Sequence, residues 1–273
     1  MKKRIIINTI TIIVIIAILV LIGIVVYGAV KNLKLEVKNP IATIKVEDYG
    51  TIKVELYPDQ APNTVANFVK LANNGFYNGL TFHRVIEGFM IQGGDKNGDG
   101  KGTPTLDDLL KNGNTTTYNI KGEMIANGYT KNKIKMEEGV IAMARSDYTS
   151  ISSSLAEESY NSAGSQFFIM QGNNPSLNGL YCGFGKVIEG MDVVDAIAKT
   201  EVTYKSSELE NGQEAPKDEN GNELTADMPI NKPVITSISV ETYGTDYGDP
   251  ETVTPFNYYN YLMKYYGANG SSY

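Results

Sequence analysis

The pattern of apolar and polar positions divides the chain into a long uncharged N-terminal segment and a domain of short, alternating strands. Met1-Lys2-Lys3-Arg4 is followed by a run without charge from Ile5 to Val30, made mostly of Ile, Val and Leu. A helix of about 20 apolar residues is long enough to cross a bilayer, where lipid offers the backbone no hydrogen bonds. The pattern predicts one transmembrane helix within residues 1–39, which form an anchor and a stalk.

A cleaved signal peptide is the alternative interpretation of this segment. The apolar core of a signal peptide spans about 7–15 residues, and no clear A-x-A cleavage site follows the run here, so an uncleaved anchor is favoured. Lysines and arginine lie on both sides of the run, with a slight bias that leaves the short N-terminal tail inside. We expect a single-pass protein of the plasma membrane with its domain outside the cytoplasm; secretion after cleavage remains the alternative.

Residues 40–243 have the pattern of a mainly β domain. The segments 41–46 and 51–56 alternate apolar and polar residues around Asp48-Tyr49-Gly50, which predicts a hairpin. Pro62 opens a stretch with helical spacing that ends at Asn74-Gly75. Short strands broken by Gly-rich turns continue to about Val194, with a second helix near 191–199. Many short strands with two helices predict a closed or nearly closed barrel capped by helices.

Composition excludes several classes of function. The net charge is −7, and no Lys/Arg cluster lies outside the extreme N-terminus, so no nucleic-acid partner is expected. The single cysteine, Cys182, cannot form an intrachain disulfide, and its apolar surroundings indicate a buried core residue. With one histidine, His83, and no CxxC, HExxH or GxSxG pattern, neither a zinc site nor a Ser-His-Asp triad is expected.

The loop that begins at Asp95 matches the first half of a calcium-binding EF-hand loop. The match fails at its twelfth position, where Leu106 stands in place of the closing carboxylate, and no flanking helices are predicted. A Gly-rich turn is therefore favoured over a dedicated calcium site. No metal and no cofactor is expected.

Four blocks of sequence, in order along the chain, carry a specific resemblance. They are FHRVIEGFMIQGGD at 82–95, GVIAMAR at 139–145, NSAGSQFFI at 161–169, and LNG at 177–179 with FGKVIEGM at 184–191. Together they resemble the cyclophilins, and the chain is identified as similar to a bacterial, membrane-anchored member. The resemblance implies a mainly β, closed eight-stranded antiparallel barrel capped by two helices and completed by a strand near 234–240, with the transmembrane helix preceding it. It also implies peptidyl-prolyl cis/trans isomerase activity.

The chemistry of that reaction suits the residues present. An X–Pro bond rotates slowly, over a barrier of about 18–20 kcal/mol, and tighter binding of the twisted amide than of the planar forms lowers it. Arg84, always charged and with a planar fork of donors, is the candidate donor to the proline nitrogen. By the resemblance, Gln92 supports Arg84, Gln166 contacts the substrate backbone and Phe89 completes the catalytic set. The substrate-binding residues that it implies are Met90, Met143, Ala144, Arg145, Phe168, Leu177 and Tyr181.

Some positions depart from the family pattern. Tyr181 stands where many eukaryotic members carry a histidine, Arg145 where an asparagine is common, and Ser176 where some members carry a tryptophan. Activity is expected to survive these changes, but tight binding of cyclosporin is not expected. His83 carries no family role and is interpreted as structural.

Three insertions interrupt the domain, near 103–117, 147–160 and 201–232, and a Tyr/Asn-rich tail follows at 244–273. Surface loops are easily lengthened, so simple decoration is favoured over a specific role for the insertions. The tail is expected to be disordered, with one short helix through Phe256, Tyr259 and Met263 as the alternative.

The sequence thus predicts an isomerase that assists folding of exported proteins at X–Pro bonds, with proline-containing polypeptides as partners. A catalytically weak proline-peptide binding or chaperone module at the cell envelope is the rival hypothesis. The joint presence of Arg84, Gln92 and Phe168 favours the enzyme.

Overall fold

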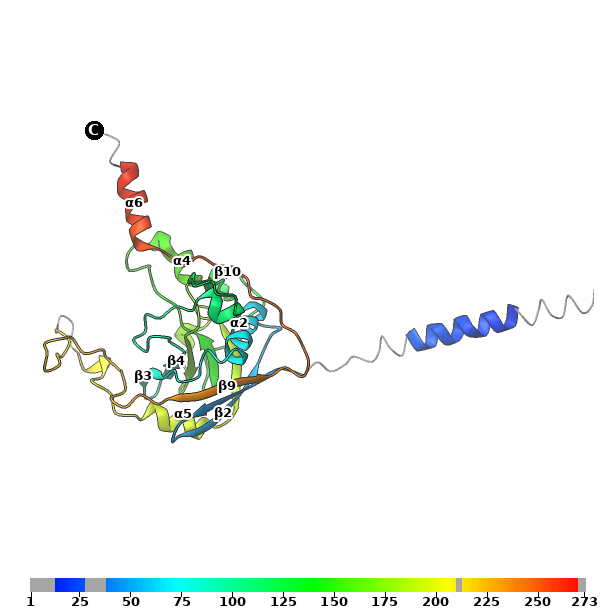
Figure 1. Cartoon of the computed structure of the whole chain (residues 1–273), viewed down its shortest axis with the longest axis horizontal. Helices are drawn as coiled ribbons and strands as arrows, with labels where there is room; N and C mark the ends of the chain where they lie inside the picture. The colour runs from blue at the N-terminus through cyan, green and yellow to red at the C-terminus, as the bar shows by residue number, and fades with distance from the viewer. Residues whose placement is uncertain (1–12, 28–37, 210–212, 270–273) are drawn as a thin grey trace, which may run out of the picture. The chain divides into compact units, whose positions relative to one another are not determined.

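The computed structural model describes residues 13–27, 38–209 and 213–269, and it divides into two compact units, 1–38 and 39–273. The second unit holds the strands and most of the helices (Figure 1). Its main elements are β1 (Ile41–Val46), β2 (Gly50–Leu56), α2 (Pro62–Asn73), β3 (Phe82–Ile86), β4 (Met90–Gly93), α3 (Leu106–Leu110), β5 (Asn119–Ile120), β6 (Val140–Met143), α4 (Ala156–Tyr160), β7 (Phe167–Met170), β8 (Gly183–Glu189), α5 (Met191–Ala198), β9 (Ile235–Glu241), β10 (Thr252–Val253) and α6 (Tyr258–Asn269).

The first unit contributes a helix over residues 13–27, whose side chains are all exposed. Across the described residues, no helix reaches the length and apolarity needed to cross a membrane. Both ends of the predicted membrane-spanning run, at 5–12 and 28–30, lie outside the described residues.

Eight antiparallel strands form the main sheet, in the order β3-β4-β7-β6-β8-β2-β1-β9. The number of strands and their direction confirm the prediction, but the predicted closure of the barrel is wrong. The end strands β3 and β9 meet only where each begins: Thr81 and Val234 form an isolated bridge, and the N–H of Phe82 donates to the carbonyl of Pro233. Further along β3, the backbone N–H of Val85 donates instead to the carbonyl of Asp227. The barrel stays open because the 201–232 insertion occupies the free edge of β3.

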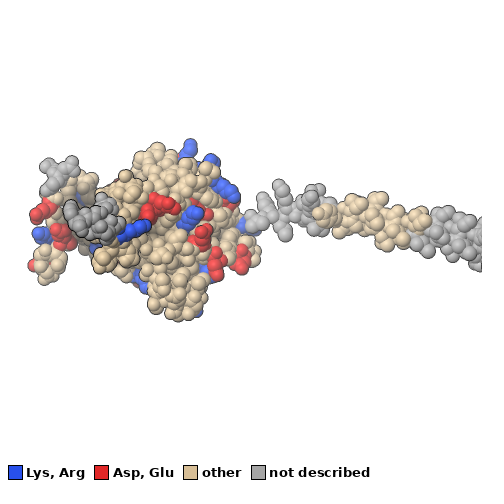
Figure 2. All heavy atoms as spheres, turned by 90° about the horizontal axis from the view of Figure 1, so that it is seen from above, with Lys and Arg blue, Asp and Glu red and all other residues tan. Residues whose placement is uncertain are grey.

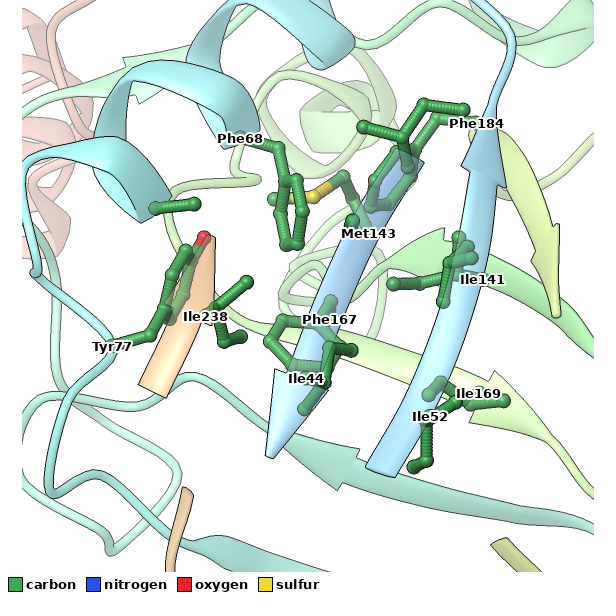
Figure 3. Close-up of a cluster of buried hydrophobic side chains, with 14 of the residues drawn as sticks. Ile44, Ile52, Phe68, Tyr77, Ile141, Met143, Phe167, Ile169, Phe184 and Ile238 are labelled. Atoms are coloured by element: carbon green, nitrogen blue, oxygen red, sulfur yellow. The ribbon is translucent and has the colours of Figure 1, made fainter. Parts of the chain in front are cut away.

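The predicted helices α2 and α5 close the apolar interior of the barrel. Phe68 projects from α2 into a cluster that includes Phe167, Phe184 and Met143 (Figure 3). The ring centroid of Phe68 lies 5.7 Å from that of Phe167 and 5.2 Å from that of Phe184. Buried aromatic side chains contribute large apolar areas to a core, so α2 is fixed to the sheet through this cluster.

A second, smaller apolar cluster lies on the other side of strands β4, β6 and β7. Successive residues of a strand point to opposite faces, so Ile91, Ile141 and Ile169 enter the main core while Met90, Ala142 and Phe168 enter the smaller cluster. Burial on both faces explains why these strands are continuously apolar in sequence instead of alternating. The side chains that point away from the main core form a row on the outer face of the barrel wall.

The insertions and the tail carry regular elements where the structure describes them. The first insertion forms α3, whose Leu109 enters the main core, and the second forms α4. The tail pairs β10 with β5, forms an ion pair between Asp249 and Lys70, and places the ring of Phe256 4.6 Å from that of Tyr148. Residues 244–253 are therefore tied to the domain, and helix α6 follows.

The surface of the domain is mixed in charge. On the face in Figure 2, lysine and arginine side chains are interspersed with aspartate and glutamate. The described residues on this face form no continuous basic area of the kind that binds a phosphate backbone.

Candidate active site

The outer row of side chains on strands β3, β4 and β7 forms the floor of a groove. Arg84 on β3 lies opposite Gln92 on β4, and Gln92 lies opposite Phe168 on β7. Because neighbouring strands are antiparallel and in register, these three side chains project from the same face of the sheet. Phe89 reaches the same face from the β3–β4 turn, where its N–H donates to the carbonyl of Ile86 at 3.0 Å.

This groove contains a cavity of about 310 Å³. Apolar side chains form one wall, and the guanidinium of Arg84 and the amide of Gln92 form another. A proline ring is small and apolar, so a cavity of this size accommodates the ring together with a flanking residue. The residues that line it are Arg84, Phe89, Met90, Gln92, Ala144, Arg145, Phe168, Leu177 and Tyr181, and each of them is a predicted site residue.

Aromatic contacts fix the shape of the apolar wall. The rings of Phe168 and Tyr181 meet edge to face, with centroids 5.5 Å apart and planes at 86°. The guanidinium of Arg145 lies 4.7 Å from the Tyr181 ring and 5.3 Å from the Tyr160 ring, and its Nε donates to the carbonyl of Leu180 at 3.1 Å. Cation–π contacts of this kind restrain both partners, so Arg145 stabilises the position of Tyr181.

A second cavity, of about 320 Å³, continues the groove on the far side of Gln92. Gln166 lies between the start of strand β7 and the Gly-rich loop 95–102. It accepts a 3.0 Å hydrogen bond from Gln92, and its own amide donates to the carbonyls of Gly100 and Gly102 at 3.1 and 3.2 Å. Gln92, Ala144 and Arg145 line both cavities, which makes the groove continuous over several residues of an extended peptide.

The Gly-rich loop is organised around a carboxylate. Asp95 accepts hydrogen bonds from the backbone N–H groups of Asn97, Asp99 and Gly100. Burial raises the pKa of Asp95, but these backbone donors outweigh it and bring the pKa below its usual value. Both carboxylate oxygens are thus engaged within the loop. In the described part of the chain, no cluster of three or more His, Cys, Asp or Glu side chains is arranged to hold a metal ion.

Among the described residues, Arg84 makes no hydrogen bond to Gln92, the residue that the resemblance gives as its support; the side-chain nitrogen of Gln92 donates to Gln166. Its guanidinium contacts a different residue, Asp227, with 3.5 Å between Nη2 and Oδ2. The Arg84 side chain is 40% exposed and faces the groove, whereas that of Asp227 is 5% exposed. The acidic partner therefore comes from the 201–232 insertion, outside the four blocks that carry the resemblance.

Met143 is the one predicted substrate-binding residue that the structure places elsewhere. It lies in the main core and is 2% exposed (Figure 3). Its neighbours Ala142 and Ala144 take the opposite face of the strand, as the twofold alternation of a strand requires. Gln166 lines the second cavity, and the other predicted residues line the first.

Two further residues have the structural character that the sequence indicates. His83 is 3% exposed, neither ring nitrogen makes a hydrogen bond of good geometry, and burial lowers its pKa. Cys182 is fully buried beside Thr64, and burial raises the pKa of its thiol to about 12. A thiol with such a pKa stays protonated at neutral pH and is unreactive.

Sequence reasoning missed Asp227, Tyr160 and the carbonyls of Gly100 and Gly102. Asp227 and Arg84 are 143 positions apart, and Asp227 lies in a polar stretch without periodicity. No local pattern indicates its position. A systematic search of the insertions for acidic residues able to reach Arg84 would have been the only route to it.

The chain is similar to known proteins over much of its second unit. Residues 41–219 match the family model described as cyclophilin type peptidyl-prolyl cis-trans isomerase/CLD. Peptidyl-prolyl cis-trans isomerase B of Bacillus subtilis is 41% identical over 157 residues, which cover 58% of this chain and 90% of that protein. A probable peptidyl-prolyl cis-trans isomerase of Brucella suis is 38% identical over 187 residues, covering 68% of this chain and 82% of the relative.

A solved structure has a similar fold. It is a Cryptosporidium parvum cyclophilin type peptidyl-prolyl cis-trans isomerase, crystallised in the presence of the dipeptide Ala-Pro. The two structures superpose with a TM-score of 0.52 at 28% identity, over 74% of this chain and 98% of that one.

Proposed function

The chain belongs to the cyclophilin family of peptidyl-prolyl cis-trans isomerases, and from that premise we propose that it isomerises X–Pro bonds of exported proteins through Arg84. Isomerisation requires no nucleophile, metal or cofactor, because no bond to a heavy atom is made or broken. The groove needs only to bind the amide most tightly when it is twisted.

Arg84 supplies the electrostatic part of this mechanism. In the twisted amide the proline nitrogen loses resonance with the carbonyl and becomes a better hydrogen-bond acceptor. The guanidinium of Arg84 lies at the edge of the apolar cavity, where a donor would reach that nitrogen once the ring is seated. A donor already in place for the charge that develops lowers the barrier without reorganisation.

The substrate is an extended peptide with proline in the apolar cavity. Phe89, Met90, Phe168 and Leu177 contact the ring, and Gln166 and the Ala144–Arg145 segment lie along the neighbouring residues. The Cryptosporidium relative was crystallised in the presence of Ala-Pro, which supports an Ala-Pro unit as the minimal substrate here.

The proposed location of the domain rests on the N-terminal segment. The uncharged run from Ile5 to Val30 supports a single membrane anchor with the domain outside the cytoplasm. Domains translocated unfolded must refold outside, and X–Pro isomerisation limits refolding on a scale of tens of seconds. An anchored isomerase acts where those chains emerge. Carbonate extraction of membranes and protease accessibility in intact cells test this location; a carbonate-soluble chain of full length would exclude the anchor.

The single observation that carries the enzymatic proposal is the cavity with Arg84 at its edge and Phe168 in its wall. The test is the relaxation of an Ala-Pro peptide at low temperature, with the full chain and with its Arg84→Ala variant. We expect acceleration by the wild-type chain and a loss of about 100-fold or more in the variant. Unchanged turnover in Arg84→Ala would exclude this mechanism, and a folded wild-type chain without activity would favour the binding module.

A further inference from the structure

The described parts of the 201–232 insertion, 201–209 and 213–232, form an antiparallel arm whose base lies beside strand β3 (yellow to gold in Figure 1). Thr203 donates to the carbonyl of Met228, and Asp227 donates to that of Tyr204, at 2.9 and 2.8 Å. The N–H of Val85, next to Arg84, donates to the carbonyl of Asp227 at 2.9 Å. The arm therefore pairs with the free edge of the strand that carries Arg84.

Asp227 is fixed at the point where the arm meets β3. Its backbone has a φ of +59°, a conformation that aspartate tolerates better than most residues. One carboxylate oxygen accepts a 2.9 Å hydrogen bond from the N–H of Ser206, and the other lies 3.5 Å from Nη2 of Arg84. Backbone pairing, side-chain hydrogen bonding and burial together restrain this carboxylate.

Arg84 has the opposite character. Its side chain is long and 40% exposed, and it makes no hydrogen bond to Gln92, the neighbour expected to support it, whose side-chain nitrogen donates to Gln166. A guanidinium is a planar fork, so a contact on one edge restricts the plane while the other edge stays available. A buried carboxylate is a suitable restraint, because it attracts the guanidinium without filling the groove.

We propose that Asp227 is a positioning residue that orients Arg84 toward the proline amide. The inference rests on the proposed role of Arg84. Asp227 lies beyond residues 41–219, the part of the chain that matches the family model. The insertion thus adds to the site a residue that the family blocks do not contain, and it acts through Arg84 without contacting substrate.

Two other roles for Asp227 make different predictions. If the carboxylate competed with substrate for Arg84, its neutralisation would increase turnover. If it only secured the arm through Ser206, its loss would lower stability and would act whether or not Arg84 were present. A positioning role lowers turnover only in the presence of Arg84.

The experiment is a double-mutant cycle in the full chain with Asp227→Asn and Arg84→Ala. Asparagine keeps the shape and an oxygen for Ser206 but loses the charge. We expect Asp227→Asn to lower kcat about three- to tenfold with KM nearly unchanged, because Arg84 acts mainly on the twisted state. In the Arg84→Ala background, measured at high enzyme concentration, Asp227→Asn should have no further effect. Asp227→Glu, which restores the charge, should recover part of the loss.

Glu208→Gln is the matched control, since it neutralises an exposed carboxylate of the same arm, and it should leave kcat unchanged. Equal losses in both backgrounds, or a gain in turnover, would overturn the inference. An inactive Arg84→Ala chain beside a fully active Asp227→Asn chain would overturn it while leaving the proposed function intact; an active Arg84→Ala chain would exclude both. Asp227→Ser, which also keeps an oxygen for Ser206, replaces Asp227→Asn if that variant does not fold.

Discussion

The side-chain amide of Gln92 donates a 3.0 Å hydrogen bond to Gln166, and this bond joins strand β4 to the segment that precedes β7. Gln166 in turn donates to the carbonyls of Gly100 and Gly102. The two glutamines therefore connect the floor of the groove to the Gly-rich loop that borders its second cavity. The Asp95 carboxylate, which accepts three backbone N–H groups, fixes the other side of that loop.

We expect Gln166→Ala to raise KM for a peptide substrate about three- to tenfold, because the loop loses two hydrogen bonds worth about 1 kcal/mol each. The melting temperature should change little, since Gln166 is only half-buried. Peptide titration and isomerisation kinetics measure the effect. Gln60→Ala is the control. It truncates a side-chain amide outside the groove, whose oxygen accepts a hydrogen bond from the backbone N–H of Lys133. An unchanged KM in Gln166→Ala would mean that the loop keeps its position without this residue.

Most of the candidate site could be predicted because its residues lie in contiguous blocks whose strand geometry is local. Arg84, Phe89, Met90 and Gln92 fall within a single strand-turn-strand unit, so their relative positions follow from the sequence alone once the hairpin is recognised. The resemblance places Met143 at the substrate, but the alternation of a strand places it in the core. Ala142 and Ala144 share one face, and the residue between them must point to the core.

What could not be predicted depends on contacts between distant segments. The arm that carries Asp227 pairs with β3 over 143 positions, and it leaves the barrel open where the sequence predicts closure. The tail is ordered through Asn63, Lys70, Asn119 and Tyr148, none of which a local pattern connects with residues 249–256. Low periodicity in an inserted segment therefore indicated polar surface but not whether the segment packs.

The charge of Arg84 should not be sufficient for its function. Arg84→Lys keeps a positive charge but loses the planar fork, so one cation can no longer contact Asp227 and the proline nitrogen together. We expect kcat to fall about tenfold or more, with a change in unfolding free energy of no more than about 1 kcal/mol, because the Arg84–Asp227 pair is partly exposed. Isomerisation kinetics and urea denaturation measure the two effects.

Arg145→Lys is the comparison for that variant, because Arg145 lines the same cavity but contacts the Tyr181 and Tyr160 rings. It should affect KM more than kcat. If Arg84→Lys were as active as the wild-type chain, the fork geometry would be irrelevant and a point charge would be enough.

Phe168 should matter for both binding and stability. It is 5% exposed, packs edge to face against Tyr181 and lines the apolar cavity. Truncation of a buried phenylalanine costs about 3 kcal/mol or more, so we expect Phe168→Ala to lower stability and also to raise KM. Phe168→Leu should keep most of the stability and still raise KM. Phe184→Leu, in the main core, should lower stability without changing KM; equal KM values in all variants would place proline elsewhere.

His83 should make the stability of the domain depend on pH between neutrality and about pH 5. In the folded chain its pKa is lowered, chiefly by burial and also by Lys232 and Arg84, against the opposing effects of Asp95 and of the Thr81 backbone. The unfolded chain takes up a proton near its usual pKa of about 6.5, so it binds more protons than the folded chain below that pH. Stability is therefore fully present above about pH 6.5 and is lost as the pH falls toward the lowered pKa, with a slope of at most about 1.4 kcal/mol per pH unit.

Urea denaturation of the wild-type chain and of His83→Leu at a series of pH values between 5 and 8 measures this dependence. Neither ring nitrogen of His83 makes a hydrogen bond of good geometry, so the leucine variant should match or exceed the wild-type stability at neutral pH. The slope between pH 5 and 6.5 should be smaller in the variant. Some carboxylates, Asp95 among them, have lowered pKa values. The stability that they contribute is lost only at more acidic pH, so it does not mask the effect of His83. Parallel pH profiles for the two chains would show that His83 becomes protonated in the folded domain as readily as in the unfolded chain.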